Sequence, residues 1–85
     1  MGTQKKRQPP TLDLHGKTVD QVFDLVDRFI TKNQNQSRLR IMPGKGTGKV
    51  KAELLSYLKL GGYPWEYEVL DSGKKNTGCL IIILD

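Results

Sequence analysis

The sequence has only one cysteine and one histidine among its 85 residues, and both scarcities limit its chemistry. A single cysteine, Cys79, excludes an intramolecular disulfide and a zinc site built from several cysteines. No apolar run approaches the roughly 18 residues of a membrane span. No early segment resembles the apolar part of a secretory signal. We therefore expect a cytoplasmic protein with no membrane contact.

Positive charge is in excess, but most of the excess lies in one short segment. The chain has 14 basic and 9 acidic side chains, and its net charge is +5. Lys5, Lys6 and Arg7 supply three of these charges, which leaves residues 11–85 with +2. A nucleic-acid-binding face must therefore arise from the placement of charges. Residues 1–10 are polar and basic, and we expect a flexible tail that is either simply solvated or a non-specific arm for phosphates.

The length and the hydrophobic content of 36% allow one domain with a modest core, and no repeat or second domain is visible. The spacing of apolar residues and the turn residues between them predict the elements of this domain. In chain order these are a strand at 11–16, a helix at 18–33, a strand at 38–42, a helix at 48–60 and a strand at 65–70. A turn-rich link at 71–78 and an apolar strand at 79–84 follow.

This order predicts an α/β protein with a single two-layer domain over residues 11–85. The expected architecture is β-α-β-α-β-β, with a four-stranded mixed sheet and two helices on one face. The first two strands should be parallel, because the crossover between them is right-handed. The wholly apolar last strand needs a central position or a partner. Thr18 with Gln21 forms a capping box for the first helix, and Gly61 with Gly62 ends the second.

The glycine-rich segment between the second strand and the second helix is the most informative stretch. Glycines allow φ > 0 and lack the Cβ that would keep a ligand away, so several backbone N–H groups can surround an anion. The following helix N-terminus and nearby lysines, Lys51 included, add positive charge. The alternative is a glycine-rich turn with incidental lysines, since the spacing fits neither a dinucleotide fingerprint nor a P-loop. The predicted phosphate contacts are Lys17, Gly44, Lys45, Gly46, Thr47, Gly48 and Lys49.

His15 follows the first strand, as the glycine loop follows the second. Ligands bind beyond the carboxyl ends of parallel strands, so adjacent strands would place the only histidine beside the phosphate loop. A histidine can accept or donate a proton near neutral pH. The alternative is an ordinary histidine without a catalytic role.

Two motifs together resemble the Smr (small MutS-related) domain family. They are Leu12-Asp13-Leu14-His15-Gly16 and Gly44-Lys45-Gly46-Thr47-Gly48, and the match in order and spacing covers residues 11–85. The resemblance implies a fold similar to the C-terminal domain of translation initiation factor 3. It also implies an endonuclease, because family members nick DNA or cleave RNA, including messenger RNA on stalled ribosomes. The functional positions it implies are Asp13 and His15 of the first motif, and Gly44, Lys45, Gly46 and Gly48 of the second.

Pro43 departs from the family pattern, in which His or Thr often precedes the first glycine. Proline donates no hydrogen bond, so a chain with Pro43 could bind a substrate without cutting it. Three functions stay open: a metal-independent ribonuclease, a non-cleaving nucleic-acid-binding or ribosome-binding module, and a protein-interaction domain that uses the last strand. In the first, Lys45 and the loop amides would stabilise the transition state.

Asp13 has several expected roles. It assists His15, contacts the substrate, or pairs with Arg38 or Arg40 across the sheet. Asp13 and His15 are too few to hold a divalent metal firmly, so we predict no metal or other cofactor as a requirement. The expected partners are single-stranded RNA or DNA and the ribosome, and the expected state is a monomer.

Overall fold

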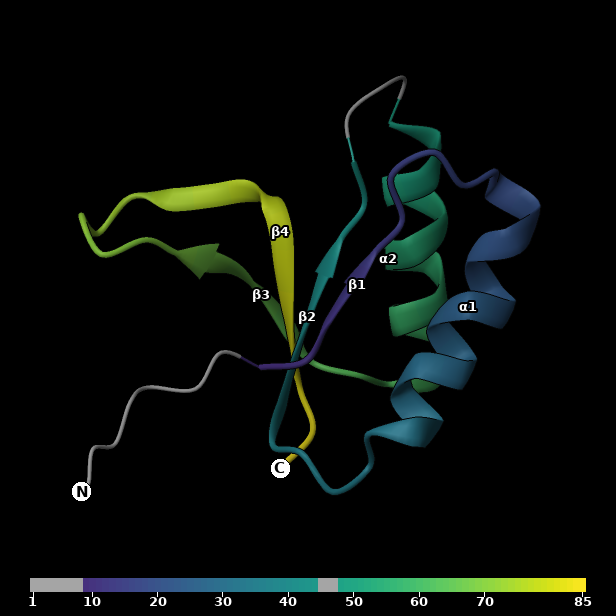
Figure 1. Ribbon diagram of the computed structural model, residues 1–85, viewed down its shortest axis with the longest axis horizontal. Coiled ribbons are helices and arrows are strands. Elements are labelled where there is room, and N and C mark those ends of the chain that lie inside the picture. Colours follow the sequence, from purple (N-terminus) through teal and green to yellow (C-terminus); the bar gives the residue numbers. More distant parts are fainter. Residues whose placement is uncertain (1–8, 45–47) are drawn as a thin grey trace.

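The computed structural model describes residues 9–44 and 48–85, and the tail predicted for residues 1–10 falls largely outside this part. The elements follow the predicted order β-α-β-α-β-β (Figure 1). They are β1 (Thr11–Asp13), α1 (Val19–Lys32), β2 (Arg38–Met42), α2 (Lys49–Gly61), β3 (Trp65–Val69) and β4 (Lys75–Ile83). No helix among the described residues is long and apolar enough to cross a membrane.

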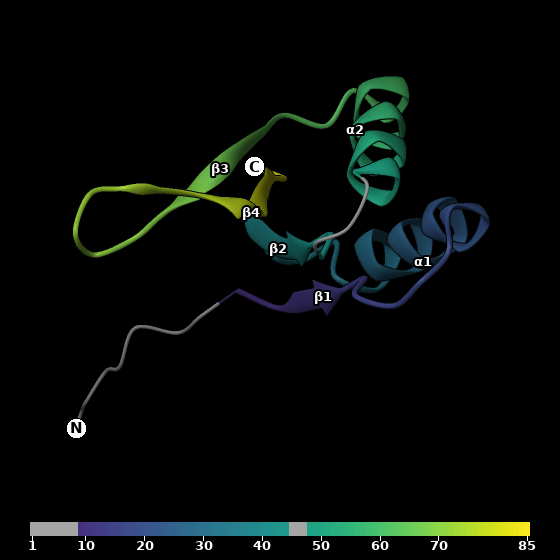
Figure 2. The ribbon, with the colours of Figure 1, turned by 90° about the horizontal axis from the view of Figure 1, so that it is seen from above.

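The four strands form one mixed sheet in the order β1-β2-β4-β3. β1 and β2 are adjacent and parallel, whereas β4 is antiparallel to both of its neighbours. Both helices cover the same face of this sheet (Figure 2). The predicted two-layer α/β architecture is confirmed, and so is the central position of the apolar last strand.

The core lies between the helices and the sheet face that they cover. Alternation along β2 sends Leu39 and Ile41 into this core, while Arg38 stays exposed on the other face. Burial of one such aliphatic side chain stabilises the fold by about 1.5–3 kcal/mol. The fully buried side chains are Leu14, Val22, Val26, Ile30, Leu39, Ile41, Leu54, Leu58, Leu80 and Ile82.

The helix ends follow the capping signals in the sequence. Thr18 precedes α1, and its backbone N–H donates a hydrogen bond to Oε1 of Gln21 over 2.9 Å, as in the predicted capping box. Gly48 precedes α2 with φ of +87°. Gly62 follows α2 with φ of +71°, a left-handed conformation that favours glycine and ends the helix.

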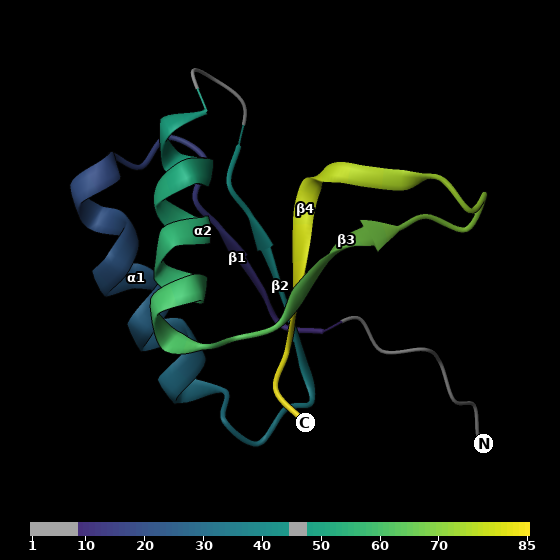
Figure 3. The same cartoon turned by 180° about the vertical axis from the view of Figure 1, so that it is seen from behind.

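The last strand begins at Lys75, so the prediction of a turn through residue 78 was wrong. Lys75 and Asn76 pair with the end of β3, and the β4 residues 77–79 then bulge out between the partners of two adjacent β3 residues. Backbone pairing requires no apolar side chains, and this part of the hairpin is exposed. The bulge bends β4, and the outer half of the hairpin projects away from the helices (Figures 1 and 3).

β1 is also shorter than predicted, because it ends at Asp13 instead of residue 16. The backbone N–H of Leu14 still donates to Met42 O over 2.8 Å, but the chain then turns. In this turn Gly16 has φ of +78°, and the N–H of Lys17 donates to Leu14 O over 2.9 Å. His15 therefore lies in a tight turn beyond the strand.

Candidate functional site

The two sequence motifs meet where Gly44 passes His15. Gly44 has φ of +86°, and a Cβ built on it would lie 3.2 Å from Cα of His15. That separation is tighter than nine in ten Cβ contacts, so glycine lets the two backbones approach this closely. The contact follows from the parallel pairing of β1 with β2, which brings their carboxyl ends together. The sequence prediction that His15 lies beside the start of the glycine loop is confirmed.

Asp13 is held by the local turn. Its Oδ1 accepts a hydrogen bond from the backbone N–H of His15 over 2.9 Å. The arginines considered as its partners pair with other carboxylates: Arg38 lies 3.5 Å from Glu66, and Arg40 lies 3.0 Å from Glu68. The alternative in which Asp13 pairs with either arginine is therefore wrong. Asp13 instead fixes the backbone that carries His15, and both side chains are exposed.

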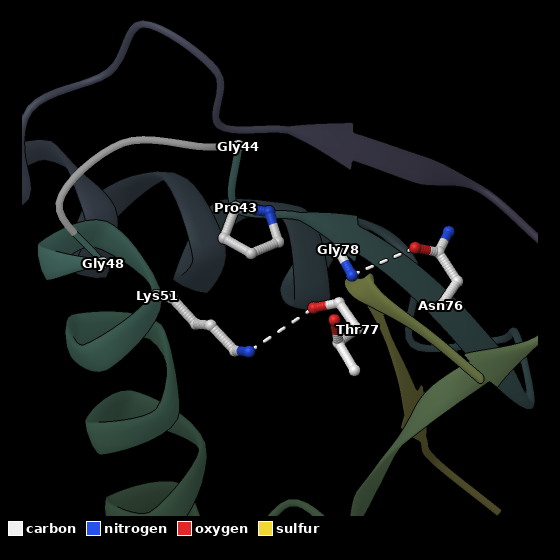
Figure 4. Close-up of a pocket in the computed structure, with 7 residues that line it drawn as sticks. All are labelled: Pro43, Gly44, Gly48, Lys51, Asn76, Thr77 and Gly78. Carbon is white, nitrogen blue, oxygen red and sulfur yellow. Dashed lines mark hydrogen bonds between the residues drawn. The ribbon is translucent and has the colours of Figure 1, made fainter.

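An open groove of about 450 Å³ lies next to this contact (Figure 4). One wall comes from the start of the glycine loop and the N-terminal end of α2, and the other comes from the β4 bulge. The lining residues are Pro43, Gly44, Gly48, Lys51, Asn76, Thr77 and Gly78. Gly44 thus contacts His15 and also lines the groove.

The other predicted phosphate contacts take different positions. Lys17 is exposed and follows the turn that carries His15, and Lys49 is the first residue of α2. Neither lines the groove, in contrast to Gly44 and Gly48. Lys45, Gly46 and Thr47 lie outside the described residues.

The β4 bulge is held in shape by a hydrogen-bonded network that starts at Arg40. The Arg40 guanidinium donates to both carboxylate oxygens of Glu68, each over 3.0 Å. Oε1 of Glu68 also accepts from the amide nitrogen of Asn76, and Asn76 Oδ1 accepts from the backbone N–H of Gly78, both over 3.0 Å. The hydrogen bond from Arg40 lowers the pKa of Glu68, although burial opposes this effect. The network thus links β2 and β3 to the groove wall.

Sequence reasoning missed the groove residues Asn76, Thr77 and Gly78, because it assigned them to a turn. A signal was available in the topology. If the apolar last strand had been paired antiparallel with the second strand, the residues just before it would have fallen beside the glycine loop. No group of three or more His, Cys, Asp or Glu side chains placed to hold a metal occurs within the described ranges.

This arrangement defines an α/β domain in which the turn after β1 and Gly44, which follows β2, lie side by side. The Smr domain family model matches residues 12–85, and the chain belongs to this family. Two curated relatives are each named Endonuclease MutS2. The protein of Fusobacterium nucleatum is 29% identical and that of Lachnoclostridium phytofermentans 31% identical, each over 75 residues. These matches cover 86% of this chain but only 10% and 9% of the relatives, so the chain spans about a tenth of their length.

Solved structures of Smr domains share the fold. The Smr domain of Thermus thermophilus MutS2 matches with a TM-score of 0.73 and 24% identity, covering 89% of this chain and 98% of that domain. The human small-MutS related domain matches with a TM-score of 0.63 and 25% identity, over 87% of this chain and 99% of that one. The SMR domain of NEDD4-binding protein 2 matches with a TM-score of 0.56 and 22% identity, over 99% and 94%. The further likeness to translation initiation factor 3 stays a prediction.

Proposed function

We propose that this domain binds single-stranded nucleic acid by its phosphate backbone and cleaves RNA with His15 as the proton-transfer residue. The observation that carries the proposal is the contact of Gly44 with the backbone of His15, which brings the chain's only histidine to the glycine loop. The two relatives named as endonucleases support a nuclease of the same class. The ribosome is a candidate source of the RNA, and the proposed state is a monomer.

Phosphate binding is supported by the surroundings of the loop. Gly48 precedes α2, and the N-terminal end of this helix carries the positive end of the helix dipole. The first turn of α2 reads Lys-Val-Lys-Ala, so no acidic side chain in it opposes an anion. Lys17 and Lys49 add charge nearby, and Lys45, Gly46 and Thr47 complete the proposed contacts.

In the proposed reaction, the 2′-oxygen of the RNA attacks the adjacent phosphorus and the bond to the 5′-oxygen breaks. His15 either accepts the proton of the 2′-hydroxyl while water protonates the leaving 5′-oxygen, or it protonates that oxygen while water accepts the proton of the 2′-hydroxyl. Lysines and loop amides stabilise the negative charge that grows on the phosphate oxygens. Asp13 positions His15 through the hydrogen bond to its backbone N–H, and because its carboxylate is exposed, it can also contact the substrate. This route needs no metal, and DNA cannot follow it because DNA lacks the 2′-hydroxyl.

A second candidate function is a nucleic-acid binder that does not cleave. Pro43 favours it, because this residue is buried, lines the groove and offers no N–H to a phosphate. The protein-interaction alternative receives less support. In the apolar part of β4, residues 80–82 are paired with β2 on one edge and with β3 on the other, and Leu80 and Ile82 are buried, so this part of the strand has no open edge to offer.

The test is a pair of assays, one with labelled single-stranded RNA and one with supercoiled plasmid, each run in EDTA and in magnesium. We expect RNA cleavage in EDTA that leaves 2′,3′-cyclic phosphate ends. Charge reversal of Lys45 and Lys49 to Glu should weaken RNA binding and flatten its salt dependence. Lys59→Glu, in the last turn of α2, should weaken RNA binding and flatten its salt dependence by a smaller amount. Binding without cleavage in any condition would favour the second candidate. Absence of binding would overturn both.

A further inference from the structure

Lys51 is a cation that faces the groove without a carboxylate partner (Figure 4). Its Nζ lies 4.7 Å from the centroid of the Tyr67 ring and 3.4 Å from the carbonyl oxygen of Thr77. Both partners attract a cation, but neither neutralises its charge. Over residues 9–44 and 48–85, Lys51 forms no ion pair, whereas Arg38 and Arg40 each pair with a glutamate. The Lys51 ammonium is therefore held in place with its charge available to a ligand.

The rest of the groove suits a ligand of nucleotide size. Its volume of about 450 Å³ lies within the range of roughly 300–1,000 Å³ typical of small-molecule sites. Gly44, Gly48 and Gly78 contribute no side chains, so a ligand can approach the backbone closely. Pro43 contributes an apolar ring and Thr77 a hydroxyl, which gives the groove apolar and polar surface together.

We propose that the groove holds the nucleotide next to the cleaved bond and that Lys51 Nζ binds its phosphate. This inference rests on the proposed function and adds a second phosphate subsite to it. The side of Gly44 that would carry a Cβ faces His15, while Gly44 also lines the groove. A strand that reaches from His15 into the groove must carry one phosphate at each place. The substrate is therefore an oligonucleotide with at least two phosphates, and a dinucleoside monophosphate lacks the second contact.

The test compares Lys51→Met with Lys59→Met, a matched lysine that is exposed in the last turn of the same helix. Methionine keeps most of the apolar stem on Tyr67 and removes the charge. Binding is measured for a labelled RNA oligonucleotide and for a dinucleoside monophosphate over a range of salt concentrations. In Lys51→Met we expect the oligonucleotide to bind roughly 3- to 10-fold more weakly, and the salt slope to fall by about 0.7, as for one lost contact to a single strand. Its affinity for the dinucleoside monophosphate, and both affinities of Lys59→Met, should not change.

Three outcomes would overturn the inference. Unchanged oligonucleotide affinity and salt slope in Lys51→Met would remove Lys51 from the interface and leave the proposed function intact. Equal weakening for both ligands would mean that Lys51 contacts the cleaved phosphate itself. If the wild-type protein binds no RNA, both the proposed function and this inference are wrong. If Lys51→Met unfolds at a lower temperature than the native protein, Lys51→Arg is measured in addition. Arginine keeps the charge, so the inference predicts that this variant keeps the salt slope.

Discussion

Gly44 passes His15 so closely that a Cβ on Gly44 would lie 3.2 Å from Cα of His15. The same glycine has φ of +86°, a conformation that side-chain-bearing residues rarely adopt. One residue therefore determines both the backbone conformation directly after β2 and its distance from the histidine. The proposed function, in which the loop binds phosphate and His15 transfers a proton, depends on this contact.

Gly44→Ala tests the contact against Gly73→Ala as its control. Gly73 has a similar φ of +90°, but nothing lies within 4 Å of a Cβ built there. The backbone strain alone should lower the free energy of unfolding by roughly 1–3 kcal/mol in either variant. We expect Gly44→Ala to be the less stable of the two in urea denaturation, and it alone should shift the NMR signals of His15. Equal stability and unshifted His15 signals would show that the contact has no consequence.

The Arg40 and Glu68 pair should stabilise the fold in a pH-dependent way. Its two hydrogen bonds lower the folded-state pKa of Glu68 below the ordinary value of 4.5. A lowered folded-state pKa stabilises the protein above the unfolded-state value, and this stabilisation is lost as the pH falls through the folded-state value. We expect Glu68→Gln to lower the free energy of unfolding at neutral pH by roughly 1–3 kcal/mol and to flatten its acid dependence.

Glu66→Gln is the control for that measurement. Glu66 lies 3.5 Å from Arg38, and both side chains are more than half exposed, at 56% and 53%. Such exposed pairs contribute about 0–1 kcal/mol, so this variant should stay close to the native stability. Identical unfolding curves for Glu66→Gln and Glu68→Gln, recorded by circular dichroism from neutral to acidic pH, would contradict the account of the network.

The Tyr57 hydroxyl should lose its proton at a higher pH than an ordinary tyrosine, and it should stabilise the packing of α1 against α2. Its hydroxyl donates to Asp27 Oδ1 over 2.9 Å and thereby joins α2 to α1. Burial, followed by this hydrogen bond, raises the pKa of Tyr57 to about 12. A raised folded-state pKa gives stabilisation that is complete below the ordinary value of 10.0 and is lost as the pH rises toward about 12.

Phenolate absorbance measured against pH tests this prediction. Tyr57→Phe should remove the latest phenolate transition and cost about 1 kcal/mol at neutral pH, since it removes one hydrogen bond and keeps the ring. The ring packs edge-on against Phe23 at 5.2 Å between centroids, and this contact should persist in the variant. If the latest transition remained in Tyr57→Phe, it would belong to another tyrosine.

The sequence predicted best the features that short-range patterns control. The bounds of β2 were predicted correctly, because Arg38, Leu39, Arg40, Ile41 and Met42 alternate between the two faces of one sheet. Both helices were predicted to within one residue at each end, since Thr18, Gly48, Asn33 and Gly62 mark those ends directly.

The start of β4 could not be predicted in this way. Lys75 and Asn76 are residue types that the sequence pattern assigned to a turn. Their strand conformation comes from backbone pairing with β3. The groove depends on the resulting bulge, so its second wall was missed as well. His15 and Gly44 could be placed together because they need only the parallel pairing of two strands.

Pro43→His tests whether Pro43 limits cleavage, with Pro43→Ala as its control. A positioned acid or base accelerates a reaction by about 10²–10⁴-fold, so an added imidazole at the groove should raise the RNA cleavage rate by about tenfold or more. Alanine removes the proline ring without supplying an imidazole, and it should leave the rate near the native value. An equal rate increase in both variants would trace the effect to the lost ring. If the cleavage rate increases in neither variant, Pro43 does not limit the reaction.

The most direct test of the central claim is the rate of RNA cleavage by His15→Ala, measured together with its affinity for the same RNA. The account predicts a rate about 10²–10⁴-fold below that of the native protein. It also predicts an affinity within about twofold of the native value, because binding depends mainly on the loop and the lysines. A His15→Ala protein that binds the RNA equally well and cuts it at the native rate would contradict the claim and remove His15 from the mechanism.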